Sequence, residues 1–172
     1  MGDPRKPRKI YSTPRDPWRA DQLAQELFIL GTYGLRNKRE LWKAQTKLST
    51  IRKQARKLLA ASTDVRLREE EILLKSLKRI GIIGFEANID DVLGLTVENL
   101  LERRLQTIVW RKGLSVSPYQ SRQLISHRHI MNSDRILSVP SYLVSSEEEG
   151  QITLKPGSRF TPIKSEEKQE TK

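Results

Sequence analysis

The chain has 172 residues and a formal net charge of +11, and its pI near 10.1 favours a polyanionic partner. It contains no cysteine, which excludes disulfides and any zinc site built on thiolates. No apolar run approaches the roughly twenty residues of a membrane span and no apolar secretory core stands near the N-terminus, so we expect a soluble intracellular protein without a membrane partner.

The charge is distributed unevenly along the chain. Residues 1–61 hold fifteen Lys/Arg against five acids, and residues 103–144 hold seven against one. Residues 62–102 are acidic, with five Lys/Arg against nine acids, and the tail from residue 145 carries a net charge of −1. Two basic regions therefore flank an acidic middle, which predicts that one protein binds RNA at two places.

The first sixteen residues are rich in proline and basic side chains and almost devoid of apolar ones. Such a segment cannot bury enough surface to fold alone, so we expect a basic arm that orders on a polyanion. A frayed, solvated terminus is the alternative reading. The cations that would contact RNA here are Arg5, Lys6, Arg8 and Lys9.

Helices are predicted to follow the arm through residue 101. Asp16-Pro17 is expected to begin the first, which extends to Gly31 with an apolar stripe of Leu23, Leu27, Phe28 and Leu30. The third begins at Ser62, has its acids first and its cations last, and offers Leu67, Leu73 or Leu74, Leu77 and Ile80 to the core. We interpret that third helix as structural. A short helical connector is expected over residues 88–93.

The second helix, over residues 38–60, carries the strongest signal in this half. Asn37 and Glu40 form a predicted capping box. The predicted inner face is Leu41, Ala44, Leu48, Ile51, Ala55 and Leu58. The other faces hold eight cations against the single acid Glu40: Lys38, Arg39, Lys43, Lys47, Arg52, Lys53, Arg56 and Lys57. A merely solvated face usually mixes signs to gain ion pairs, so this one favours contact with phosphates.

The second basic region is predicted to form a compact module of two short helices and short strands. Apolar spacing predicts one helix from Thr96 to the stop at Gly113, and Ser117-Pro118 begins another whose Arg122 faces outward. Strands are expected at residues 130–131, at 136–139 as an edge, and as a final pair, 142–144 and 152–154, around an acidic turn. The candidate RNA-contacting residues of this module are Arg104, Arg111, Lys112, Tyr119, Arg122, His127, Arg128 and His129.

Enzymatic readings of the chain are weak. His127 and His129 lack nearby carboxylate or thiolate ligands, which leaves a phosphate donor or a packed imidazole as equal alternatives. Acidic runs at 90–91 and 147–149 are typical of solvated turns, and residues 81–84 lack the lysine of a phosphate loop. For Trp18, Trp42 and Trp110, packing is favoured over stacking on bases. We predict no catalysis, no metal and no cofactor.

Several motifs together resemble a known family. The module resembles the RNA-binding domain named after ribosomal protein S-four in Arg104-Leu105, Gly113-Leu114, Ser121-Arg122-Gln123-Leu124-Ile125, His127-Arg128-His129-Ile130 and Pro140-Ser141-Tyr142. The N-terminal half resembles the archaeal and eukaryotic-type ribosomal members in residues 1–4, 33–42 and 54–59. The likeness extends to about residue 155. One departure is Ser133-Asp134, where many relatives carry Asn-Gly at a hairpin turn.

This resemblance implies an α+β fold in which an N-terminal α-helical region (17–101) packs beside an S-four-type module (102–157), between a flexible basic arm (1–16) and a flexible tail (158–172). It implies a monomeric constituent of the cytoplasmic small ribosomal subunit that binds rRNA at a helix junction of the five-prime domain. It also implies a role in nucleating assembly and in translational accuracy. The implied partners are small-subunit rRNA, neighbouring small-subunit proteins, and mRNA where it enters the subunit.

Two alternatives remain open from the sequence. A non-ribosomal structured-RNA-binding factor could use the same domain, and would need only residues 103–157 for binding. A basic DNA-binding protein would bind duplex DNA as tightly as structured RNA at matched salt. If Arg122 contacts a phosphate, Arg122→Ala should weaken RNA binding and lower its salt dependence by about one phosphate's worth.

Overall fold

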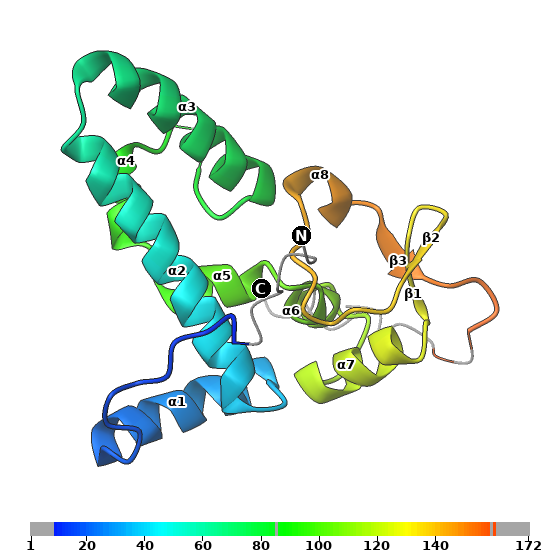
Figure 1. Ribbon diagram of the computed structural model, residues 1–172. Helices are drawn as coiled ribbons and strands as arrows, with labels where there is room; N and C mark the ends of the chain where they lie inside the picture. The colour runs from blue at the N-terminus through cyan, green and yellow to red at the C-terminus, as the bar shows by residue number, and fades with distance from the viewer. Residues whose placement is uncertain (1–8, 85, 159, 161–172) are drawn as a thin grey trace, which may run out of the picture.

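The computed structural model describes residues 9–84, 86–158 and 160. Within them the chain forms helices α1 Ala20–Tyr33, α2 Lys38–Leu59, α3 Thr63–Ile80, α4 Ile89–Gly94, α5 Val97–Glu102, α6 Leu105–Arg111, α7 Pro118–Ser126 and α8 Ser146–Glu149. Strands β1 Ile130–Asn132, β2 Arg135–Leu137 and β3 Ile152–Leu154 make one antiparallel sheet in the order β2-β1-β3. The predicted α+β class, with a helical region beside a small mixed module, is confirmed (Figure 1).

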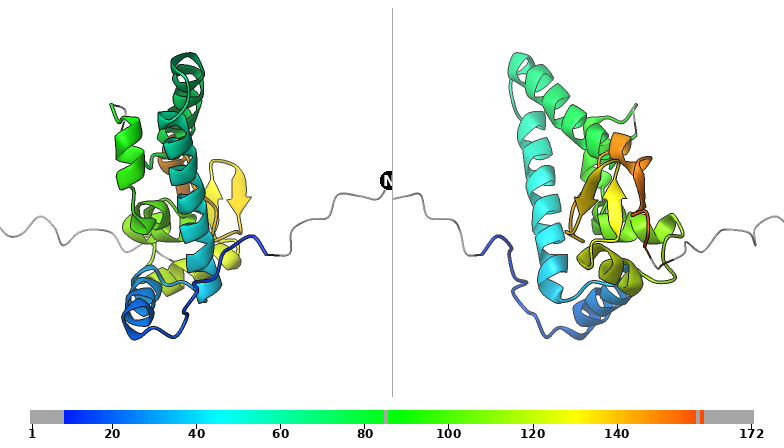
Figure 2. Two further views of the ribbon diagram at one scale, coloured as in Figure 1. Left: turned by 60° about the vertical axis from the view of Figure 1, so that its left-hand side comes forward. Right: turned by 90° about the vertical axis from the view of Figure 1, so that its right-hand side faces the viewer.

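The α2 helix is the long axis of the helical region. It pairs with α3 in a hairpin that projects away from the sheet (Figure 2). Its predicted inner face is confirmed: Ala44 is half-buried and the other five members are buried. Those from Leu48 onward pack with α3, α4 and α5 in one apolar cluster. This periodic burial leaves the cationic faces of α2 outside the core.

The first helix differs from its prediction at both ends. Residues 17–18 form a turn and α1 begins at Ala20. Gly31 stays helical, and the helix continues to Tyr33. Gly34 ends it in the left-handed conformation, with φ of +58°, which glycine adopts without a side-chain clash. The expected apolar stripe is also wrong in part, since Phe28 is 72% exposed and Leu27 is 55% exposed.

The third helix and the connector follow the sequence closely. Ser62 precedes the start of α3 and Gly81 ends it with φ of +74°. Leu77 is buried and Leu73, Leu74 and Ile80 pack against the same cluster, whereas Leu67 is 69% exposed and was wrongly placed in the core. The connector α4 has the full capping box of Asn88 and Asp91.

The predicted single helix from Thr96 to Gly113 is broken into α5 and α6. Thr96 caps α5 as expected, and Gly113 follows α6 with φ of +71°. Between the two helices, segment 140–144 supplies the backbone partners. The amide of Leu105 donates to the Tyr142 carbonyl at 2.8 Å, and Arg103 accepts from the Val144 amide at 3.0 Å. Tertiary hydrogen bonds thus replace the helical ones, although the side-chain periodicity continues across the break.

The sheet corrects one predicted pairing. β3 pairs with β1, and Leu143 instead forms an isolated bridge with Arg104, so residues 142–144 and 152–154 are not partners. The expected acidic turn between them is the helical turn α8, with a capping box of Ser145 and Glu148. The edge position of β2 is confirmed. Its two-residue loop to β1 places Ser133 at φ of +49°.

Three apolar clusters form the core of the described chain. One lies among α2, α3, α4 and α5, and a second joins α6 and α7 to the sheet through Leu105, Ile125 and Ile130. The third contains Tyr33, Leu35, Leu41 and Leu101, and it seats the beginning of α2 on α5. The basic arm also docks in part, since the Tyr11 ring stacks on Trp42 and the Ser12 amide donates to Thr46 Oγ1 at 2.9 Å.

Candidate nucleic-acid interface

The α2 helix presents an exposed row of cations that we call the α2 surface: Arg39, Lys43, Lys47, Lys53, Arg56 and Lys57. Within the part of the chain that the structure describes, no carboxylate lies within ion-pair distance of these six side chains. Partial burial lowers the pKa of Lys47. Because like charges this close repel one another, the α2 surface is suited to an anionic partner.

Two of the eight cations predicted on this helix serve the fold instead. Lys38 pairs with the Glu26 carboxylate at 3.0 Å, and Arg52 donates to the Leu95 carbonyl. Glu26 is buried, and burial by itself would raise its pKa. Hydrogen bonds from Trp42, Lys38 and Gln22 outweigh that effect and keep the pKa of Glu26 below its ordinary value.

The three tryptophans divide between packing and exposure. Trp42 is a packing residue, as predicted: its Nε1 donates to Glu26 at 3.1 Å and its ring stacks on Tyr11. Trp110 is half-buried, and the Arg111 guanidinium lies 4.7 Å from its ring centroid. Trp18 is 86% exposed, so the packing prediction is wrong for that residue.

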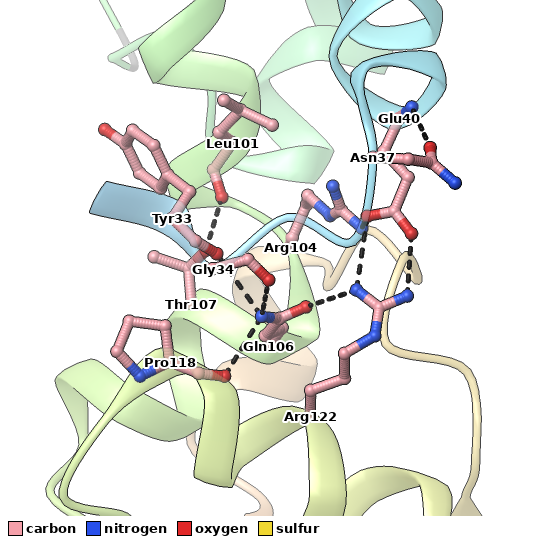
Figure 3. Close-up of polar contacts among 10 residues, drawn as sticks. All are labelled: Tyr33, Gly34, Asn37, Glu40, Leu101, Arg104, Gln106, Thr107, Pro118 and Arg122. Carbon is pink, nitrogen blue, oxygen red and sulfur yellow. Dashed lines mark hydrogen bonds and ion pairs between the residues drawn. The ribbon is translucent and has the colours of Figure 1, made fainter. Parts of the chain in front are cut away.

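In the module, Arg104 and Arg122 converge on one carboxylate, that of Glu40 on α2 (Figure 3). Arg104 donates to Oε2 at 2.9 Å, while Arg122 donates to Oε1 at 2.7 Å and to Oε2 at 3.2 Å. Burial alone would raise the pKa of Glu40, but the hydrogen bonds and charges of Arg122 and Arg104 lower it. The prediction that Arg122 faces outward is therefore wrong.

The predicted capping box at the start of α2 is half right. The Asn37 side chain accepts from the Glu40 amide at 3.2 Å, as a cap should. The Glu40 carboxylate does not return to the Asn37 amide, because the two arginines of the module hold it. The tertiary contact has replaced the local one.

Gln106 links the Glu40–Arg122 contact to the backbone of the helical region and of the module. Its side-chain nitrogen donates to the carbonyls of Gly34 at 2.8 Å, Pro118 at 3.0 Å and Tyr33 at 3.3 Å, and its oxygen accepts from Arg122 at 3.2 Å. Gln106 is 1% exposed, and its bonds to the Tyr33 and Gly34 carbonyls are fully buried, where a hydrogen bond is stronger than in water.

Two further cations of the module are also engaged internally. Arg111 makes a two-point contact with Glu102, at 2.7 and 3.2 Å, and the hydrogen bond with Glu102 raises the pKa of Arg111. Lys112 donates to the carbonyls of Glu149 and Ile152. Both side chains remain exposed at the surface, so these contacts orient them without removing them from solvent.

The exposed remainder of the module lies at the two ends of α7. Tyr119 and His127 are exposed, and Arg128 is exposed with φ of +62°. His129 is half-buried, with Nδ1 3.3 Å from Ser158 Oγ and its ring against Phe160, which fits the packed-imidazole reading. Together with Arg111 and Lys112, the three exposed residues form what we call the module surface.

The remaining predicted contacts belong to the arm and the turn after α1. Lys9 lies 5.5 Å from the centroid of the Tyr11 ring, and Arg36 is exposed. Arg5, Lys6 and Arg8 lie outside the described residues. Within residues 103–144, one exposed cation was not selected from the sequence: Arg135 on the edge strand β2. The only signal for it was its contribution to the basic charge of residues 103–144.

A hollow of about 360 Å³ opens between α2 and segment 140–143. Its lining combines apolar and cationic side chains, from Ile10, Glu40, Lys43, Ala44, Lys47, Leu100, Leu101, Arg104, Ser141 and Leu143. Two lysines of the α2 surface thus stand beside the Glu40–Arg104 pair, where the two basic regions of the chain come together.

Comparisons with known protein families first define the class. Residues 103–149 match the S4 domain, and residues 5–102 match the family described as "Ribosomal protein S4/S9 N-terminal domain". This combination defines an RNA-binding ribosomal protein, as the resemblance of the motifs predicted.

Curated relatives then give the particular family. The small ribosomal subunit protein uS4 of Cenarchaeum symbiosum is 54% identical over 95% of this chain and 80% of its own length. Those of Nitrosopumilus maritimus and Ignicoccus hospitalis are each 49% identical, over 99% and 93% of this chain and 85% and 96% of theirs. The chain belongs to the uS4 family of small ribosomal subunit proteins, which are structural components of the translation machinery and not enzymes.

Neither metal chemistry nor a membrane span is indicated in the described part of the chain. There, no three side chains among His, Asp and Glu gather closely enough to hold a metal ion. No described helix is both long enough and apolar enough to cross a bilayer.

Proposed function

We propose that this protein binds small-subunit rRNA directly, with the α2 surface and the module surface contacting two RNA helices that meet at a junction. The single observation that carries the proposal is the α2 surface, where six exposed cations lie along one helix without a carboxylate partner in the described residues. Phosphates would neutralise this charge. Because both surfaces contact backbone, the protein would recognise RNA shape more than base edges.

The residues we assign to the RNA contact follow the two surfaces and the arm. They are Arg5, Lys6, Arg8, Lys9, Arg39, Lys43, Lys47, Lys53, Arg56, Lys57, Arg111, Lys112, Tyr119, His127 and Arg128, together with Arg36 from the turn after α1. His129 is left out because its ring is packed against Ser158 and Phe160. Lys38 and Arg52 contribute positive charge while holding the fold, because each already has a partner within the protein. Arg104 and Arg122, which the sequence assigned to RNA, are not included because both are paired with Glu40.

Membership of the uS4 family supports the finer assignments. We place the target in the five-prime domain of the small-subunit rRNA, where early binding would nucleate assembly. The same family likeness supports a contribution to translational accuracy, contacts with neighbouring small-subunit proteins and with mRNA where it enters the subunit, and a single copy per ribosome in the cytoplasm.

We propose four segments for the chain: the arm 1–16, the helical region 17–101, the RNA-binding module 102–157 and the tail 158–172. Family matches to residues 5–102 and 103–149 support a boundary after α5. The break between α5 and α6 falls at the same place. Tyr11 and Ser12, however, contact α2, so the arm is anchored to the helical region near its end.

The test is salt-dependent binding of the full chain to the folded five-prime domain and to an unrelated structured RNA of equal length. We expect a strong preference for the five-prime domain that persists at physiological salt. Equal affinities that fall together as salt rises would contradict a specific rRNA binder. Duplex DNA binding as tight as RNA binding would favour the basic DNA-binding alternative.

A matched pair of variants tests the contribution of the helical region. Lys53→Gln/Arg56→Gln removes two charges from the α2 surface, and Arg68→Gln/Arg79→Gln removes two exposed charges from α3. We expect the first to weaken RNA binding and to lower the salt slope by about two, and the second to change little. Equal, small effects would favour the non-ribosomal factor in which the module alone binds.

A further inference from the structure

The contact between the two basic regions contains four polar side chains that we call the Glu40 lock: Glu40, Arg104, Gln106 and Arg122. They come from α2, from the residue before α6, from α6 and from α7. The sequence distances are large, at 64 residues between Glu40 and Arg104 and 82 between Glu40 and Arg122. The lock therefore forms only when the helical region and the module have packed together.

The lock is protected from solvent. Arg104 is 6% exposed, and the side chains of Arg122 and Glu40 are 24% and 18% exposed. One carboxylate faces two guanidinium groups, so breaking either pair would leave a partly buried charge without full compensation. That cost exceeds what an exposed ion pair with a phosphate returns. Arg104 and Arg122 are thus held inside the protein while the cations of the α2 surface are not.

Geometry distinguishes this contact from the apolar packing beside it. Leu35, Leu41 and Leu101 pack the beginning of α2 against α5 inside the helical region, and apolar contacts of this kind have little directional preference. The Arg122 fork and the Glu40 carboxylate meet at two points, which constrains rotation as well as distance. The two N–H groups of the Gln106 side chain add directed hydrogen bonds to the turn before α2 and to the start of α7.

We propose that the Glu40 lock sets the angle between the α2 surface and the module surface, and thereby determines which RNA junction geometry the protein prefers. Glu40, Arg104, Gln106 and Arg122 are positioning residues that act through the exposed cations. The inference rests on the proposed function for its RNA readout. It also replaces the sequence-based assignment of Arg104 and Arg122 as phosphate contacts.

The decisive variant is Glu40→Gln, because positioning and simple electrostatics predict opposite results. Removing an anion from a basic protein should tighten binding to every RNA if only charge matters. If the lock sets the angle, affinity for the five-prime domain should fall at least tenfold, with affinity for the unrelated RNA and the salt slope unchanged. Tighter or unchanged binding to the five-prime domain would overturn the proposal.

Arg122→Lys tests the same idea with the charge kept. Lysine retains the cation and loses the planar fork, so we expect a loss of preference similar to that of Glu40→Gln. Arg122→Gln should likewise leave the salt slope unchanged. A slope lowered by about one, with both RNAs weakened equally, would make Arg122 a phosphate contact and overturn the proposal.

Glu71→Gln is the matched control. It removes the same charge from an exposed pair with Lys75 on α3, and we expect no change in RNA preference. A loss of preference equal to that of Glu40→Gln would show that the lock has no special role.

A measurement without RNA separates this inference from the proposed function. Because the chain has no cysteine, spin labels can be placed through Ser49→Cys on α2 and Ser126→Cys on α7, both exposed. We expect a narrow distance distribution in the parent protein and a broader or shifted one with Glu40→Gln or Arg122→Lys. Identical narrow distributions would overturn the lock even if the parent protein prefers the five-prime domain.

Discussion

Two groups of cations in this protein look alike in sequence and behave differently in the structure. On α2, Lys53, Arg56 and Lys57 are exposed without a carboxylate near them in the described residues. At the junction of the regions, Arg104 and Arg122 are paired with Glu40 and largely withdrawn from solvent. The first group has the character of a ligand-binding surface, and the second that of a structural contact.

This difference teaches that the environment of a basic residue, more than its presence in a basic segment, decides its role. Residues 103–144 contain one acid, Asp134, so from this segment alone every cation in it is expected to be free to bind phosphate. The carboxylate that neutralises two of them comes from the other basic region. Glu40, the single acid of the cationic α2 helix, is the residue that neutralises both arginines. From the sequence alone, its position three residues after Asn37 was explained by a capping box.

Gln106→Ala should have the largest effect on stability, and it tests the structural side of the comparison. The change leaves three carbonyls at the junction without their donor and opens a cavity at a buried site. We expect a loss of about 4 kcal/mol in the free energy of unfolding. Urea denaturation measures it, and a loss below about 1 kcal/mol would show that the junction does not depend on this side chain.

Glu40→Gln should cost about 3 kcal/mol near neutral pH, because it leaves two arginines without their carboxylate. The folded pKa of Glu40 lies below its ordinary value of 4.5, so the pair contributes fully above the unfolded pKa. That contribution is lost as pH falls through the lowered folded pKa. Unfolding curves of both proteins should therefore converge in acid, and a difference independent of pH would contradict an ionic role for Glu40.

Tyr33→Phe should cost about 1 kcal/mol at neutral pH, through loss of the hydrogen bond from the Tyr33 hydroxyl to Glu102 at 3.1 Å. Burial and the nearby charge of Glu102 raise the pKa of Tyr33 to about 12. The wild-type tyrosine therefore loses stability as pH rises from its unfolded pKa of about 10 toward 12, which phenylalanine does not. The advantage of tyrosine should vanish near pH 11 in denaturation experiments, and a constant advantage up to that pH would refute the shift.

Lys53→Gln should have the smallest effect on stability, within about 0.5 kcal/mol, because the side chain is exposed and unpaired in the described structure. RNA binding should nevertheless weaken about fivefold and the salt slope fall by roughly one. A destabilisation as large as that of Glu40→Gln would erase the distinction between the two groups of cations.

Much of the fold was predictable because it follows local rules. The inner face of α2, the caps at Ser62, Thr96 and Ser117, and the glycine stop at Gly113 are where the sequence placed them. Capping and periodic burial involve residues within one or two turns, so a single sequence contains the information. The motifs that resemble the family were also local and led to the confirmed family.

The errors occurred where distant segments meet. The break between α5 and α6 depends on hydrogen bonds with residues 140–144. Strand β3 pairs with β1 and not with segment 142–144, which is nearer in sequence. Leu67 and Phe28 have apolar side chains at plausible helical positions, yet nothing in the described chain packs over them. Periodicity indicates which faces are apolar, and only the neighbours decide which of those faces are covered.

The sequence by itself determined the α+β class, the basic regions on either side of an acidic middle, the identity of α2 as a cationic helix, and the family. These follow from composition, spacing and motifs along the chain. Only the tertiary structure decided which cations remain available to RNA, because charge neutralisation depends on distance in space. Glu40 lies far from Arg104 and Arg122 along the chain, and the folded chain brings its carboxylate within 3 Å of both.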